Sequence, residues 1–183
     1  RLLMDRRRHR DNVIHVYRSL FKHSKLLNYI LLTSMFYGVA TLVAVWAYQK
    51  YWQELQIPLI YFGYLWAASN LAVAITARYA HKLEKLVGSS VIVVVMALLP
   101  VAGYLGIALT EALWGIVFCL CFQVSRGINA VIIRDALNKR VTGDLRATAN
   151  SVSSLGVRGL FIVLGPLAGY LMDTYGIRST FFG

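Results

Sequence analysis

Residues 88–109 read GSSVIVVVMALLPVAGYLGIAL, and this stretch decides the fold. It contains no charged side chain and shows no strict alternation of polar and apolar residues. A helix needs about 20 predominantly apolar residues to cross the roughly 30 Å hydrocarbon core of a bilayer. Because backbone polar groups in lipid must be paired within the protein, a run of this length indicates a membrane-spanning helix rather than a barrel strand.

Four more apolar runs of similar length flank this stretch. We predict an all-α integral membrane protein with spans at residues 26–48, 58–77, 88–109, 112–133 and 147–171. Residues 179–183 begin a further apolar run, which we interpret as a sixth span that is cut off. The first residue is Arg1 and not Met, so we expect the chain to be a piece of a longer protein.

The composition agrees with a membrane location. Of the 183 residues, 58% are hydrophobic and 15% are charged, and the mean hydropathy is +0.59. A soluble domain carries about 25% charged residues, so this chain has too little polar surface to cover a core that faces water. The net charge of +11 could suggest a nucleic-acid-binding protein, but such proteins carry their basic residues on a soluble core.

The basic side chains are distributed unequally between the two sides of the predicted spans. One side carries Arg1, Arg6, Arg7, Arg8, Arg10, Arg18, Lys22, Lys25, Arg78, Lys82, Lys85, Arg134, Lys139, Arg140 and Arg146. The other side carries only Lys50 and Arg178. Since cytoplasmic connections are enriched in Lys and Arg, we expect a multi-pass protein of the plasma (cell inner) membrane with its N-terminal segment in the cytoplasm.

The N-terminal segment, residues 1–25, is predicted to be a cytoplasmic loop. Its apolar residues Val13, Ile14, Tyr17, Leu20 and Phe21 recur at helical spacing. This pattern is typical of an amphipathic helix at the membrane interface, with basic side chains near anionic headgroups. The alternative is an ordinary solvated connector.

Two arginines, Arg126 and Arg158, fall inside predicted spans. Counted from Arg134 and Arg146, they lie about 12 Å and about 18 Å into the membrane. An arginine at the centre of a bilayer costs at least about 2.5 kcal/mol, and all eight acidic residues lie in connections or at helix ends. The counter-charge is therefore an anionic ligand, an acid in an absent part of the protein, or water and backbone carbonyls. The alternative is that these arginines brace one helix against another.

Other polar residues recur at helical spacing within the spans. The candidates for a polar path are Arg158, Arg126, Gln123, Asn129, Asn150, Ser154, Tyr37, Thr41 and Asn70. Together these residues could wall a path for a solute across the membrane. Taken singly, each could instead form a hydrogen bond between helices, an interaction worth under about 1 kcal/mol.

Two of the spans differ in the surface they present. The third span is almost uniformly apolar from Val91 to Leu99, with Pro100 and a single Tyr104 beyond, and it is predicted to face lipid. In the fifth span, Gly165, Pro166 and Gly169 combine a proline kink with a pair of small residues at a spacing of four. Such a pair permits close approach of another backbone, so we predict a helix-packing or gating role for these three residues.

Three stretches of sequence resemble a known family. Residues 134–151 read RDALNKRVTGDLRATANS and lead into GPLAGYLMD at residues 165–173, and both resemble the tenth and eleventh spans of bacterial major facilitator superfamily transporters. Residues 54–63, ELQIPLIYFG, are similar to the entry of the family's eighth span. In contrast, residues 78–85 keep the basic character of the family's gating loop but lack its pattern of Asp and Gly.

This resemblance implies a bundle of twelve helices in two halves that carries a solute by alternating access. The chain would be the C-terminal half: the central loop, spans seven to eleven and the start of span twelve. Spans seven and ten would line the cavity, eight and eleven would contact the other half, and nine would face lipid. The segment from Gly165 to Gly169 is similar to a motif typical of exporters, and Arg126 with Gly127 resembles the family's span-four arginine motif.

The function expected from these observations is secondary active transport of a small solute, with an anionic solute favoured by the two arginines. The partners expected are that solute, membrane lipids and the missing N-terminal half, which would supply any carboxylate that couples transport to protons. A non-transporting membrane sensor or scaffold with the same fold is the alternative.

An intramembrane enzyme is the third possibility that we considered. Acid–base or metal chemistry needs carboxylates, His or Cys that converge at one depth. The four histidines, His9, His15, His23 and His81, are all predicted to be cytoplasmic, and Cys119 and Cys121 point to different sides of one helix. We therefore expect no enzyme activity, no catalytic residue, no metal and no cofactor.

Overall fold

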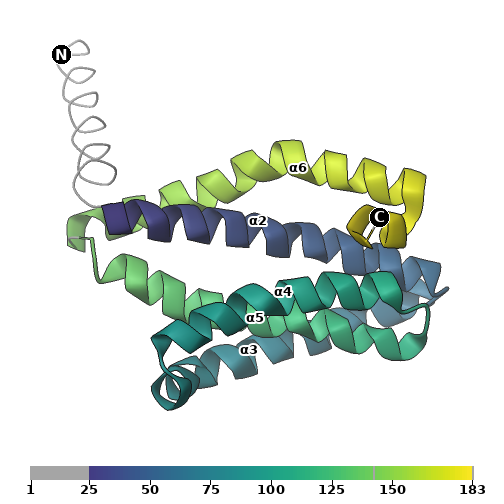
Figure 1. Cartoon of the computed structure of the whole chain (residues 1–183), viewed down its shortest axis with the longest axis horizontal. Helices are drawn as coiled ribbons and strands as arrows, with labels where there is room; N and C mark the ends of the chain where they lie inside the picture. The colour runs from purple at the N-terminus through teal and green to yellow at the C-terminus, as the bar shows by residue number, and fades with distance from the viewer. Residues whose placement is uncertain (1–24, 142, 183) are drawn as a thin grey trace, which may run out of the picture.

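The computed structural model describes residues 25–141 and 143–182 (Figure 1). Its elements are α2 (Lys25–Glu54), η2 (Leu59–Tyr61), α3 (Phe62–Val87), α4 (Ser89–Leu109), η3 (Leu113–Gly115), α5 (Ile116–Asn138), η4 (Gly143–Leu145) and α6 (Arg146–Phe182). The interfacial helix proposed for residues 1–25 falls almost entirely outside these described residues.

The described part of the chain is helical and contains no strand. Five helices there, α2 to α6, are long and apolar enough to cross a membrane. This confirms the prediction of an all-α fold compatible with a multi-pass membrane bundle.

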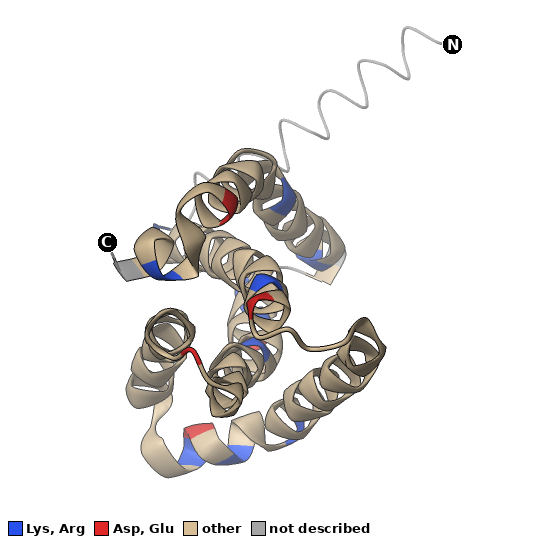
Figure 2. Ribbon diagram, turned by 90° about the vertical axis from the view of Figure 1, so that its right-hand side faces the viewer, with Lys and Arg blue, Asp and Glu red and all other residues tan. Residues whose placement is uncertain are grey.

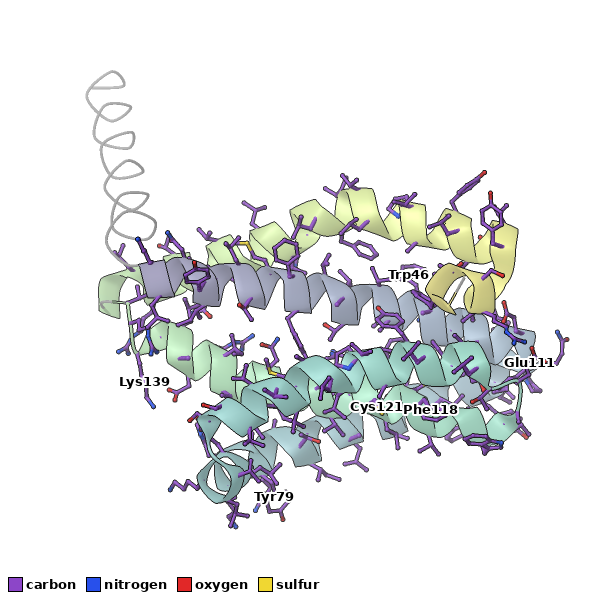
Figure 3. All side chains as sticks on the ribbon, in the orientation of Figure 1. Trp46, Tyr79, Glu111, Phe118, Cys121 and Lys139 are labelled. Carbon is purple, nitrogen blue, oxygen red and sulfur yellow. The ribbon has the colours of Figure 1, made fainter. Side chains whose placement is uncertain are left out.

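Successive helices run in opposite directions (Figure 1). The helix ends that carry most of the basic residues therefore lie at the same end of the bundle. α2 packs mainly on α6, and α5 packs on both α3 and α4. We call the end that holds Lys25, Lys82, Lys85, Lys139 and Arg146 the basic end. Figure 3 shows Lys139 at this end and Glu111 at the other, which we call the opposite end. Seen end-on, most of the ribbon carries neither acidic nor basic residues (Figure 2).

The opposite end is filled by an aromatic cluster, which consists of Tyr48, Trp52, Trp66 and Phe122. The Tyr48 ring centroid lies 5.0 Å from that of Trp52, 5.5 Å from that of Trp66 and 6.5 Å from that of Phe122. Tilted and edge-on pairs at these distances add to the energy of area burial. Because the four rings come from α2, α3 and α5, they pack these three helices together at this end.

A proline inside α4 is accommodated by side chains from two other helices. Pro100 has no N–H, so the carbonyl of Met96, four residues earlier, loses its helical hydrogen bond. Ser125 Oγ of α5 donates to this carbonyl at 2.9 Å, and the Tyr37 hydroxyl of α2 donates to it at 2.5 Å. The buried carbonyl is thereby paired, as a hydrocarbon environment requires.

The third span, predicted to face lipid, has one face of α4 exposed and the other buried against the bundle. Ile92, Met96, Gly103 and Gly106 of α4 are buried. A Cβ added at Gly103 would lie 2.6 Å from the Phe122 ring, so the missing side chain lets α5 come close. The helices with the fewest buried residues are α3 and α6.

Close helix contacts occur at glycines other than those predicted. A Cβ at Gly127 would lie 2.8 Å from the Val73 carbonyl oxygen, so α3 and α5 touch through their backbones there. A Cβ at Gly169 would meet nothing within 4 Å, and one at Gly165 would meet Phe161 of the same helix. Among the described residues, therefore, no other helix uses the Gly165–Pro166–Gly169 surface.

The end of α6 contains a break at Gly176, whose φ of 79° is unfavourable for residues with a side chain. After this residue the chain turns back toward α2 (Figure 1). Ile177 is buried in the core around the aromatic cluster, and the Phe181 ring lies 4.6 Å from the Tyr104 ring. Residues 179–182 of the run predicted to start a sixth span lie in this returning segment, and residue 183 is outside the described residues.

Candidate functional site

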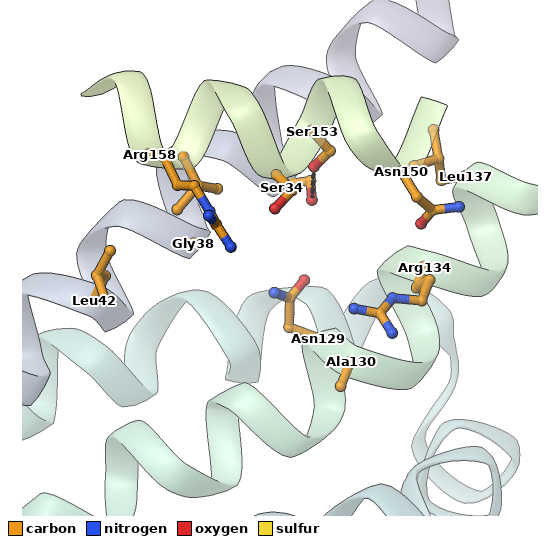
Figure 4. Close-up of a pocket in the computed structure, with 12 residues that line it drawn as sticks. Ser34, Gly38, Leu42, Asn129, Ala130, Arg134, Leu137, Asn150, Ser153 and Arg158 are labelled. Atoms are coloured by element: carbon orange, nitrogen blue, oxygen red, sulfur yellow. Dashed lines mark hydrogen bonds between the residues drawn. The ribbon is translucent and has the colours of Figure 1, made fainter. Parts of the chain in front are cut away.

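A cavity of about 590 Å³ lies between α2, α5 and α6 (Figure 4). Its lining consists of Ser34, Gly38, Leu42, Asn129, Ala130, Arg134, Leu137, Asn150, Ser153, Ser154, Val157 and Arg158. The volume falls within the range of small-molecule sites, about 300–1,000 Å³. The cavity reaches from the middle of α2 and α6 to the last turns of α5 at the basic end. We call it the polar cavity.

Helical periodicity explains how each wall forms. On α6, Asn150, Ser154 and Arg158 are spaced four residues apart and so share one face. On α2, Ser34, Gly38 and Leu42 have the same spacing, and Val157 of α6 packs directly over Gly38, 2.4 Å from where a Cβ would stand. α2 and α6 therefore form one continuous wall, and α5 faces it across the cavity.

Two arginines extend into the polar cavity from opposite walls. Figure 4 shows Arg158 reaching down from α6 and Arg134 reaching in from α5. Among the side chains that the structure describes, neither guanidinium forms a hydrogen bond or an ion pair. The lining of the cavity includes no Asp or Glu. The described part of the site therefore carries two positive charges that no neighbouring side chain neutralises.

The carboxylate next to Arg134 in the sequence is occupied elsewhere. Asp135 Oδ2 lies 2.7 Å from Lys139 Nζ, one turn further along at the basic end. The hydrogen bond from Lys139 lowers the pKa of Asp135, and the same contact raises the pKa of Lys139. Asp135 is thus paired with Lys139 and does not pair with Arg134, whose side chain lines the cavity.

Amides and hydroxyls complete the polar lining. The Ser34 and Ser153 hydroxyls are 2.8 Å apart, across the contact between α2 and α6 (Figure 4). Asn150 Nδ2 donates to Asn138 Oδ1 at 2.7 Å. The side-chain oxygen of Asn129 is buried and has no hydrogen-bond partner in the described structure. Asn129 is also one of the residues that line the cavity.

The structure separates the predicted path residues into two groups. Arg158, Asn129, Asn150 and Ser154 line the polar cavity together. The other five predicted residues, Arg126, Gln123, Tyr37, Thr41 and Asn70, do not line it.

Those five residues make contacts within the bundle instead. Arg126 Nη1 donates to Gln123 Oε1 at 3.0 Å, between residues of one helix. The Tyr37 hydroxyl donates a hydrogen bond to the Met96 carbonyl of α4. The Thr41 hydroxyl donates to the Tyr37 and Gly38 carbonyls of its own helix. Asn70 Nδ2 donates to the Trp66 carbonyl at 2.9 Å. Only the bond from Tyr37 joins two helices, as the alternative interpretation expects. The bonds of Arg126, Thr41 and Asn70 each lie within a single helix.

Sequence reasoning missed the three other polar residues of the lining, Arg134, Ser34 and Ser153. Arg134 counted as part of the basic rim, but side chains on a helix tilt toward its N-terminus. For α5 that direction leads into the membrane, so a residue near the basic end reaches the cavity. For Ser34, the available signal was its four-residue spacing to Gly38 and Leu42.

The chemistry that this lining supports is binding of a polar, negatively charged group. Guanidinium groups hold carboxylate and phosphate oxygens in two-pronged contacts. In the described residues no group of three His, Cys, Asp or Glu side chains could hold a metal ion, and Cys119 and Cys121 are unpaired thiols.

Comparison with known proteins adds no identification: no family model, curated protein or solved structure matches this chain.

Proposed function

We propose that this chain is part of a secondary transporter of the major facilitator type, which moves a small solute across the membrane by alternating access. The observation that carries the proposal is the polar cavity with its two unpaired arginines, set among helices apolar enough to span a bilayer. Polar groups at this depth are costly unless they serve a ligand, an ion or a proton pathway. A solute site near the middle of the bundle supplies that reason.

The two ends of the bundle differ in a way that fits one state of such a cycle. The polar cavity extends toward the basic end, and the aromatic cluster fills the opposite end. If the basic end is cytoplasmic, as the distribution of Lys and Arg predicts, this state is open to the cytoplasm.

Contacts at the opposite end would have to break for the cavity to open there. Lys50 Nζ of α2 is 2.8 Å from Asp173 Oδ1 of α6. The Tyr51 hydroxyl donates to the Ala112 carbonyl at 2.8 Å, between α2 and the connection before α5. These bonds tie α2 to α6 and to the start of α5, so they stabilise the closed opposite end in this state.

Further helices of the same polypeptide would complete the bundle. Arg158 of α6 and Asn70 of α3 are exposed, although both lie well inside helices that would span the membrane. Lipid cannot solvate an exposed guanidinium at this depth. We propose that the N-terminal half of the protein packs on α3 and α6, where it would also contact the unused surface at Gly165, Pro166 and Gly169.

A flux experiment tests this function. The complete polypeptide is reconstituted in liposomes, and uptake of radiolabelled succinate, lactate, glucose and alanine is followed under a proton or sodium gradient. We expect gradient-dependent uptake of at least one solute, and we expect Arg158→Gln to abolish it. Arg140→Gln is the matched control because Arg140 is exposed at the basic end and outside the cavity.

Absence of movement for every solute in this panel, in liposomes that hold folded protein, would contradict the transport proposal. It would favour a sensor or scaffold with the same architecture. Equal uptake by Arg158→Gln and by the unchanged protein would contradict the role of the polar cavity and leave transport itself standing.

A further inference from the structure

We infer that the solute bound in the polar cavity is a small organic dianion, held by Arg134 of α5 and Arg158 of α6. The inference deepens the proposed function, on which it rests for the claim that the bound molecule is carried. It adds the charge class of the solute and assigns Arg134, a residue near the end of its helix, as the second ligand.

Charge balance is the first argument. Two guanidinium groups enter one cavity, none of the lining residues is acidic, and neither group has a partner in the described chain. Arginine stays protonated in proteins, so the cavity cannot lose this charge by releasing a proton. Like charges that share one cavity repel each other. A ligand with two negative charges neutralises both groups, whereas a monoanion leaves one unpaired.

The arrangement of the two arginines is the second argument. Arg158 and Arg134 come from facing walls and point toward the same space (Figure 4). A molecule with two carboxylates, or one phosphate monoester group, offers oxygens on opposite sides. It can therefore accept two-pronged hydrogen bonds from both walls at once.

The remaining lining fits the rest of such a molecule. Leu42 and Val157 provide an apolar surface for a short carbon skeleton. Asn129 and Asn150 add amide groups, which can present either a donor or an acceptor to the ligand. With about 590 Å³, the cavity has room for a solute of a few carbon atoms together with water.

Binding a dianion would also link the solute to the movement of helices. α5 and α6 lie on opposite sides of the cavity, and each supplies one of the two charges. A ligand bound to both arginines draws these walls together, and an empty cavity leaves the two positive charges to repel. The same charges thus favour an open empty cavity and a closed loaded one.

The test measures binding separately from transport. The complete polypeptide is placed in phosphatidylcholine nanodiscs, and calorimetric titration is done with succinate, its half-amide succinamate and its diamide succinamide. These compounds have nearly the same shape and carry two, one and no negative charges. Glycerol 3-phosphate and glycerol form a second pair of the same design.

We expect succinate or glycerol 3-phosphate to bind, the monoanion to bind about tenfold or more weakly, and the neutral compounds not to bind. Arg134→Gln and Arg158→Gln should each weaken dianion binding by about tenfold or more, while Arg140→Gln leaves it unchanged. Arg134→Lys and Arg158→Lys keep the charge and should retain part of the affinity. If a glutamine variant fails to fold, the lysine variant at the same position is used in its place to measure how far affinity depends on the guanidinium group.

Several outcomes would overturn the inference. They are equal binding of the neutral and dianionic members of a pair, no binding of either dianion, and unchanged affinity in Arg134→Gln. Binding restricted to nanodiscs that contain phosphatidylglycerol, without competition by either dianion, would assign the arginines to a lipid headgroup instead. Dianion binding without flux would support the dianion site and contradict the transport proposal. Flux of an uncharged solute without dianion binding would support transport and contradict the dianion site.

Discussion

Two hydroxyl groups donate hydrogen bonds to the Met96 carbonyl. Removing both hydroxyls in one variant should lower the free energy of unfolding by more than the sum of the losses from removing each one alone. The carbonyl lost its helical partner to Pro100, and Ser125 Oγ and the Tyr37 hydroxyl both donate to it. While either hydroxyl remains, the carbonyl is paired. When both are gone, Met96 leaves an unpaired acceptor in a buried position, since its exposed fraction is 2%.

The magnitudes follow from hydrogen bonding in membranes. A single side-chain hydrogen bond between membrane helices contributes about 0.6 kcal/mol on average, so Ser125→Ala and Tyr37→Phe should each cost about that much. An unpaired polar group in an apolar interior costs about 1–3 kcal/mol more than a paired one. The double variant should therefore lose about 2–4 kcal/mol, well above the roughly 1.2 kcal/mol sum of the single losses.

The assay is reversible unfolding of the complete polypeptide in mixed micelles, with the free energy of unfolding measured for each variant of the cycle. Ser151→Ala and Tyr29→Phe are matched controls, because both of these positions are exposed. Repeating the cycle in Pro100→Ala, which restores the helical N–H, should remove most of the excess loss. Costs that add to within about 0.5 kcal/mol would refute the claim that the hydroxyls share this carbonyl.

Three further predictions address packing, gating and orientation. Gly127→Ala would place a Cβ 2.8 Å from a backbone oxygen of α3 and should cost about 1–3 kcal/mol of unfolding free energy, whereas Gly159→Ala, with nothing within 4 Å, should be neutral or stabilising. Asp173→Asn breaks an exposed ion pair with Lys50 that is worth about 0–1 kcal/mol. The rate of amide hydrogen exchange around the aromatic cluster should therefore rise by only about two- to fivefold. Unchanged exchange would show that this ion pair does not hold the opposite end closed. Cysteines introduced at Lys139 and Glu111 should be labelled by an impermeant maleimide from the cytoplasmic and the outer side respectively, and the reverse pattern would overturn the predicted orientation.

The helical elements of the fold were readable from the sequence because apolar run length is a strong constraint in a membrane. Which face of each helix is buried was less readable. A uniformly apolar span such as residues 88–109 gives no polar face to exclude from lipid, so periodicity could not orient it. The informative residues were the small ones: Gly103 and Gly106 mark the face of α4 that receives the Phe122 and Phe118 rings of α5.

The candidate site was predicted in part. The four-residue spacing of Asn150, Ser154 and Arg158 correctly indicated one shared face of α6, because this spacing is a property of the helix alone. The position of a residue along its helix proved a poorer guide. Arg126 is deeper than Arg134, yet it bonds Gln123 of its own helix, while Arg134 reaches the polar cavity. Which way a long side chain extends depends on neighbouring helices, and those cannot be read from one span.

The shared Met96 carbonyl also restricts how the bundle can move. α2 and α5 both donate to one oxygen atom of α4, so this carbonyl links the three helices part-way along the bundle. If α2 or α5 slid along α4 or separated from it at Met96, the carbonyl oxygen would lose a hydrogen bond in an apolar environment. If the helices tilted about this oxygen, both hydrogen bonds would be kept. The shared carbonyl is therefore a point about which the three helices can tilt while both of these hydrogen bonds remain.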